Sequence, residues 1–133
     1  MLCYDILTRN QRHVLDLLLA EKTALSAYTI LDRLRIKGFR APLQVYRALE
    51  KLIKLGLVHR LESLNAFIAC SRPECEEHSL IAFVICRKCS NIIEFDNGVI
   101  DDNVKKHMQT INFWPQDTIL EIRGICAGCH SFV

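Results

Sequence analysis

The sequence contains no run of about eighteen apolar residues, the length that a membrane-spanning helix requires. It also lacks a charged N-terminal region followed by an apolar core, which a secretory signal would show. We therefore expect a cytoplasmic protein with no membrane partner.

Signs of catalysis are missing as well. The sequence shows no nucleophile paired with a base, no phosphate-binding loop and no convincing pair of catalytic carboxylates. Low-complexity segments are absent, and half of the 133 residues are hydrophobic while 24% are charged, which is typical of a soluble globular protein. We predict that the protein is not an enzyme.

Cysteine is the residue type that the sequence has in unusual number. Seven cysteines in a secreted chain would suggest disulfides, but their odd count and the missing export signal favour metal ligands or redox thiols. Four of them form two Cys-x-x-Cys pairs, Cys86 with Cys89 and Cys126 with Cys129. Each short gap lets both thiolates of a pair face one point, and two pairs complete a closed tetrahedral zinc site. The spacing favours structural zinc, with a redox dithiol pair as the alternative.

Charge is distributed unevenly along the chain. Residues 1–70 carry eleven Lys and Arg against six Asp and Glu, whereas residues 71–133 carry six against nine. A basic first half fits a nucleic-acid-binding module joined to a different domain, although a fluctuation of surface charge is the simpler alternative. Because the polar segment 71–77 separates the halves, we predict domains at 1–70 and 78–133 with 71–77 as a hinge.

The first half is predicted to contain three helices and a β-hairpin. Apolar residues at helical spacing indicate helices over 11–20, 26–38 and 41–56, with Ser26 as the N-cap of the second and Pro42 in the first turn of the third. The strand-like stretches LVHRLE and AFIAC follow, with SLN as the turn between them. This is the element order of a winged-helix domain.

The third predicted helix has the clearest pattern of the chain. One side should be buried, because its apolar residues recur at helical spacing: Val45, Leu49, Leu52 and Ile53. The other side presents a polar, mostly basic stripe formed by Gln44, Arg47, Lys51 and Lys54. In a winged helix, this stripe would face the major groove of double-stranded DNA and the hairpin would be the wing. We therefore predict DNA as a partner.

The second half is predicted to contain strands on both sides of the first Cys-x-x-Cys turn, then a helix over 99–111, and a further strand before the second turn. The predicted fold class is accordingly α+β, with an N-terminal winged-helix domain and a small C-terminal α/β domain that holds the zinc knuckle pair.

The hairpin carries a soft metal ligand at each end, His59 and Cys70. If its turn centres on Leu64–Asn65, His59 lies directly opposite Cys70, and such partners have Cβ atoms about 4.5–5.5 Å apart on one face. A different register would break this arrangement. A buried histidine and a small hydrophobic cysteine are also common without a metal. A shared metal site and a chance pairing both stay open on these residues alone.

Several motifs in order resemble the ferric uptake regulator family, and within it the branch that senses zinc. These are SAYTILDRLR, VYRALEKLIKLGLVHRLES, NAFIAC and the spaced pair CRKC and CAGC, which together extend from about Leu7 to Cys129. The resemblance implies a homodimeric, metal-dependent DNA-binding repressor whose C-terminal domain forms the dimer. It also implies two zinc ions per subunit, a structural one at the four paired cysteines and a regulatory one at His59, Cys70, His78 and Glu94.

The resemblance assigns DNA contacts and a metal as well. Arg47 matches a base-contacting arginine and Tyr28 a tyrosine that approaches DNA, so the predicted DNA-binding residues are Tyr28, Gln44, Tyr46, Arg47, Lys51 and Lys54. One thiolate, two imidazoles and one carboxylate suit tetrahedral zinc better than harder metals.

The expected function is zinc-dependent repression of zinc uptake genes, with no other small-molecule substrate. The alternatives are a repressor that senses another divalent metal, a DNA-binding protein whose zinc is purely structural, and a zinc-stabilised protein with thiol redox activity.

Overall fold

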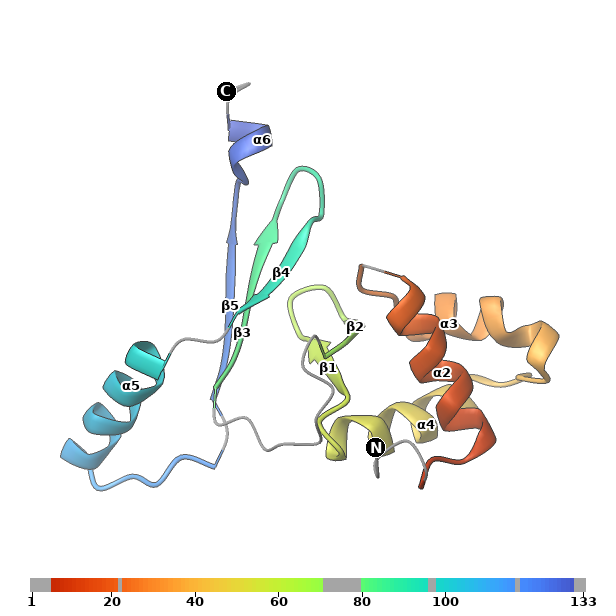
Figure 1. Cartoon of the computed structure of the whole chain (residues 1–133), viewed down its shortest axis with the longest axis horizontal. Coiled ribbons are helices and arrows are strands. Elements are labelled where there is room, and N and C mark those ends of the chain that lie inside the picture. The colour runs from red at the N-terminus through yellow and green to blue at the C-terminus, as the bar shows by residue number, and fades with distance from the viewer. Residues whose placement is uncertain (1–5, 22, 71–79, 96–97, 117, 131–133) are drawn as a thin grey trace. The chain divides into compact units, whose positions relative to one another are not determined.

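The structure, a computed structural model, describes residues 6–21, 23–70, 80–95, 98–116 and 118–130. The chain divides into two compact units, Met1–Glu76 and Glu77–Val133 (Figure 1). The predicted hinge at 71–77 lies outside the described residues, so it stays a prediction.

The first unit has the predicted order of helices followed by a hairpin. Its elements are α2 (Arg9–Ala20), α3 (Ala27–Leu34), the 3₁₀ helix η1 (Arg35–Lys37), α4 (Pro42–Lys54), β1 (Val58–Leu61) and β2 (Ala66–Ala69). The Ser26 side chain accepts a hydrogen bond from the Thr29 backbone N–H, and Pro42 occupies the first position of α4, as predicted. The second predicted helix ends early, because the chain tightens into η1 before Gly38 adopts a left-handed φ of 97°.

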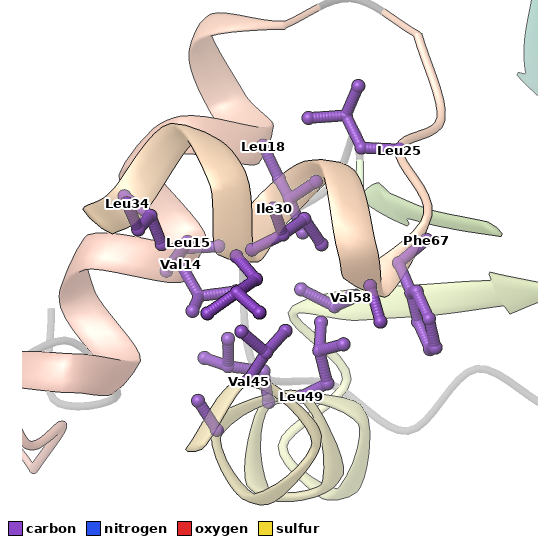
Figure 2. Packing of buried hydrophobic residues seen from close by; sticks show 14 of the residues in the cluster. Val14, Leu15, Leu18, Leu25, Ile30, Leu34, Val45, Leu49, Val58 and Phe67 are labelled. Atoms are coloured by element: carbon purple, nitrogen blue, oxygen red, sulfur yellow. The ribbon is translucent and has the colours of Figure 1, made fainter. Parts of the chain in front are cut away.

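The core of the first unit lies where the three helices meet the hairpin. Figure 2 shows side chains of Val14 and Leu15 from α2, Ile30 from α3 and Leu49 from α4 pointing toward one another. On α4 the buried side consists of Val45, Ala48, Leu49 and Leu52, which follow one another at helical spacing. The prediction that Ile53 is buried is wrong. Its side chain is 39% exposed, because the position after Leu52 turns to the edge of the buried stripe.

Truncating the centre of this core should unfold the first unit more easily. Leu49 is 1% exposed, so Leu49→Ala is expected to lower the free energy of unfolding by about 2–5 kcal/mol. Ile53→Ala on the same helix serves as the control and should cost less than about 1 kcal/mol. Urea denaturation followed by far-ultraviolet circular dichroism measures both. Equal losses for the two variants would contradict the assignment of the core.

The second unit consists of β3 (Leu80–Cys86), β4 (Ile92–Phe95), α5 (Gly98–Thr110), β5 (Thr118–Gly124) and the short helix α6 (Ala127–His130). The predicted strands and the helix over 99–111 are confirmed, whereas α6 was not expected. The strands form a sheet in the order β4-β3-β5 (Figure 1).

The pairing of β3 determines where the cysteines lie. Its partner β4 is antiparallel, but β5 is parallel to β3 and pairs Cys86 with Gly124. The C-terminal ends of parallel strands in this register lie side by side at the same end of the sheet. The two Cys-x-x-Cys turns, which follow β3 and β5, are therefore brought together at that end.

No helix in the part of the chain that the structure describes has the length and apolar character needed to span a membrane.

Candidate metal sites and nucleic-acid interface

The four paired cysteines come together at the end of the β3–β5 pair. Their sulfur atoms all lie within 4.8 Å of one another, and the sulfurs of Cys89 and Cys126 are 3.7 Å apart. A tetrahedral zinc ion with bonds of about 2.3 Å to sulfur needs neighbouring sulfurs about 3.8 Å apart. A disulfide would need about 2.05 Å, and the cysteines in the described residues are free. The cluster therefore fits zinc in both ligand type and spacing.

Backbone groups prepare one thiol of this cluster to act as a thiolate. N–H groups of Cys89 and Cys126 hydrogen-bond to the Cys86 sulfur and lower the pKa of its thiol from 9.0 to about 6. A side-chain hydrogen bond to the neighbouring Cys126 sulfur favours the protonated form of Cys129 and raises the pKa of its thiol to about 12. Four sulfurs this close cannot all ionise without a cation among them. The donor set thus suits a divalent metal that accepts thiolates.

The hairpin register differs from the prediction. His59 pairs with Ile68 rather than with Cys70, because the loop between the strands has four residues, Glu62 to Asn65, and Asn65 closes it with a left-handed φ of 47°. Cys70 continues the ladder beyond β2, where its N–H donates to the Leu57 carbonyl over 2.8 Å.

His59 and Cys70 nevertheless share one face of the hairpin. Cys70 lies two residues beyond Ile68, and residues two apart on a strand point to the same side, so Cys70 is the diagonal neighbour of His59. Their ligand atoms lie within 4.8 Å of one another. Both side chains are buried, at 5% and 2% exposure, and His59 is the one polar side chain among the described residues that is buried to this degree. An imidazole and a thiol placed together in this way are ligands of the type that tetrahedral zinc takes.

The other two predicted ligands belong to the second unit. Glu94 lies on β4 opposite Phe83 and is half-buried. His78 lies outside the described residues, so its assignment stays a prediction.

The predicted DNA-contacting stripe lies on the exposed side of α4. Arg47, Lys51 and Lys54 are exposed and lie outside the buried stripe of the helix. Tyr28 on α3 is 70% exposed, and Tyr46 on α4 is 46% exposed. The first unit therefore presents basic and aromatic groups to solvent together.

Gln44 has a structural task that the sequence pattern did not reveal. Its side-chain carbonyl oxygen accepts hydrogen bonds from the N–H groups of Arg40, over 2.6 Å, and Ala41, over 3.0 Å. These bonds fasten the start of α4. This oxygen already accepts two hydrogen bonds, so the NH₂ group is the part of the Gln44 side chain that can donate a hydrogen bond to a DNA base.

Comparison with known proteins shows to which family the chain belongs. The sequence profile described as the ferric uptake regulator family matches residues 6–123. The chain belongs to this family. The zinc uptake regulation protein of Escherichia coli K12 is 33% identical over 124 residues, which cover 92% of this chain and 72% of that protein. The ferric uptake regulation protein of Legionella pneumophila is 31% identical over 88 residues, covering 65% of this chain and 61% of that protein.

Two solved structures of this family are similar in both fold and sequence. The holo form of XcZur has a TM-score of 0.85 and 36% identity, with 94% of this chain and 86% of that chain covered. A zinc uptake regulator complexed with zinc and DNA has a TM-score of 0.89 and 30% identity, with 98% of this chain and 89% of that chain covered. The predicted fold class, a winged helix followed by an α/β domain, agrees with these family members.

Proposed function

We propose that this protein is a zinc-responsive homodimeric repressor that binds operator DNA when loaded with zinc and thereby controls zinc uptake genes. The observation that carries the proposal is the likeness, over 98% of the chain, to a zinc uptake regulator complexed with zinc and DNA. The proposal includes action in the cytoplasm and no catalytic activity.

The proposal includes two zinc ions per subunit. Cys86, Cys89, Cys126 and Cys129 would bind the structural ion, which the spacing of their sulfurs supports. The regulatory ion would be held by His59 and Cys70 from the first unit and by His78 and Glu94 from beyond the segment 71–77. When bound, a metal at these four residues acts as a cross-link between the two units.

The response to zinc then follows from linkage. A ligand that favours one arrangement of the two units raises the affinity of any second ligand that needs the same arrangement. Operator DNA is such a ligand, because the recognition helices of a dimer must enter successive major grooves about 34 Å apart. DNA in turn should raise the affinity for zinc by the same factor.

The second unit offers a surface for the second copy. Trp114 is 82% exposed, and β5, an edge strand of its sheet, exposes Ile119 at 52% and Ile122 at 44%. Large apolar side chains gathered on one small unit are a mark of a protein–protein interface, and open strand edges are usually covered. This supports dimerisation through the second unit.

Selection of DNA sequences at controlled free zinc tests the proposal. Random duplexes are selected with the full chain, and binding of the enriched duplex is followed by fluorescence anisotropy against buffered free Zn²⁺, Mn²⁺ and Fe²⁺. We expect sequence-specific binding that rises with Zn²⁺ at concentrations where the other two ions have no effect. Enrichment of no sequence, or a response to Mn²⁺ or Fe²⁺ at lower concentration, would overturn the proposal. Binding that is sequence-specific but independent of metal would leave the zinc purely structural.

Arg47 and Lys51 should affect DNA binding differently. Arg47→Ala removes the fork to guanine, so discrimination at one base pair of the selected duplex should fall by about 1–3 kcal/mol. Lys51→Ala removes a phosphate contact, so all sequences should weaken by a similar factor and the salt dependence should fall by about one unit of slope. Anisotropy titrations at several salt concentrations measure both variants. A variant Arg47→Ala that keeps full sequence discrimination would contradict the assignment.

A further inference from the structure

Leu43 is a large apolar residue whose side chain is exposed on α4 rather than packed in the core. It is the second residue of α4, and its side chain is 56% exposed. Successive residues of a helix are separated by about 100° around the axis. The buried residues Val45, Ala48, Leu49 and Leu52 then centre on a direction roughly 170° from Leu43. Leu43 therefore points almost directly away from the core.

The neighbours of Leu43 are the groups already assigned to DNA. Tyr46 and Arg47 follow it by three and four residues, so all three share one helix face. Lys54 continues this face at the far end of α4. A single exposed leucine is ordinary at a protein surface, but this one lies at the N-terminal end of the basic stripe, in the first turn of the helix that a winged-helix protein inserts into the major groove.

The first turn of α4 has little else with which to read bases. Reading adenine takes both an acceptor and a donor from one side-chain amide, and the Gln44 oxygen is already bound to the N–H groups of Arg40 and Ala41. Pro42 has no polar side chain. An apolar group in the major groove has one favourable partner among the base edges, the C5-methyl group of thymine.

We propose that Leu43 is a specificity-determining residue that contacts the methyl group of a thymine next to the base read by Arg47. This rests on the proposed DNA-binding function and adds a second determinant to it. Because Leu43 carries no charge, it contributes to sequence preference and leaves the salt dependence of binding unchanged.

Replacing thymine by uracil tests this contact, since uracil lacks the methyl group and keeps every hydrogen-bonding atom. Each thymine of the duplex selected by the wild-type protein is replaced in turn, and the dissociation constants are measured for wild type, Leu43→Ala and Ile53→Ala. Ile53→Ala is the matched control, because it removes an exposed apolar side chain ten residues, or about 15 Å, farther along the same helix. Circular dichroism and zinc content establish that the variants are folded.

In each half-site we expect one thymine, adjacent to the guanine that Arg47 recognises, whose replacement by uracil weakens wild-type binding. The affinity should fall about three- to fivefold, as the loss of one buried methyl group implies. Leu43→Ala should bind the thymine duplex more weakly and show no loss on uracil substitution there, whereas Ile53→Ala should behave like wild type. A wild-type protein indifferent to uracil at every position overturns the inference, as does a Leu43→Ala variant with the wild-type thymine-to-uracil ratio. Failure to select any duplex overturns the proposed function and this inference with it.

Discussion

Replacing Cys70 by serine is expected to abolish the zinc response of operator binding while leaving the fold in place. Serine keeps the shape of the side chain but replaces a thiolate with a hydroxyl that does not ionise, and zinc in proteins is bound through thiolate sulfur. Loss of an outer-sphere partner of a metal ligand already costs about 10–100-fold in affinity. Loss of a ligand should cost more, so the free zinc needed for half-maximal DNA binding should rise by over about 100-fold.

The control for this variant must place a hydroxyl in the same hairpin without touching a ligand. Ala66→Ser does so, because Ala66 lies on β2 and is 7% exposed. Any general cost of burying a hydroxyl there should appear in both variants. Anisotropy titrations against buffered zinc compare the two. If Cys70→Ser keeps the zinc dependence of wild type, then the regulatory site is wrongly assigned, whereas the DNA-binding function would still stand.

The hairpin shows how far the sequence alone determines such a site. The strand-like stretches LVHRLE and AFIAC identified both strands, but the number of residues in the loop depends on backbone angles such as the left-handed φ of Asn65, which the sequence does not display. The resulting error was a shift of two residues, from the predicted Cys70 opposite His59 to the observed Ile68. An even shift keeps every side chain on its face, whereas a shift of one would have moved Cys70 to the other side. His59 and Cys70 therefore still meet, as diagonal neighbours.

The four-cysteine cluster was easier to predict, because local spacing fixes most of its geometry. A Cys-x-x-Cys turn brings its own two sulfurs together wherever it lies. What the sequence could not show is how the two turns meet, since this depends on the parallel pairing of β3 with β5 across an intervening strand and helix. Helix α6 was missed for a related reason. It has four residues, too few for an apolar period, and its backbone is fixed by hydrogen bonds from Cys129 and His130 to the carbonyl of Cys126.

The second large effect is expected from Cys126→Ser, which should destabilise the second unit as a whole. Among the described residues of this unit, the buried hydrophobic side chains all lie on β3, and α5 has none. So small a core leaves much of the stability to the metal, and structural zinc contributes about 10–16 kcal/mol of apparent binding energy in small zinc-dependent folds. Losing even about 3 kcal/mol would lower the unfolding midpoint by about 12–24 °C in a unit of this size.

Two readouts separate this effect from a change in the first unit. The chain has a single tryptophan, Trp114, which belongs to the second unit, so its fluorescence during heating follows that unit. Zinc content should fall by one ion per chain, and treatment of the wild type with a strong zinc chelator should reproduce the lowered midpoint.

Ala127→Ser is the matched control, because it adds a hydroxyl at an exposed position between Cys126 and Cys129 and keeps all four thiolates. If Cys126→Ser retains the zinc content and the midpoint of that control, the four cysteines do not hold a structural zinc ion. The loss should also extend to DNA binding, because a dimer formed through the second unit requires that unit to be folded.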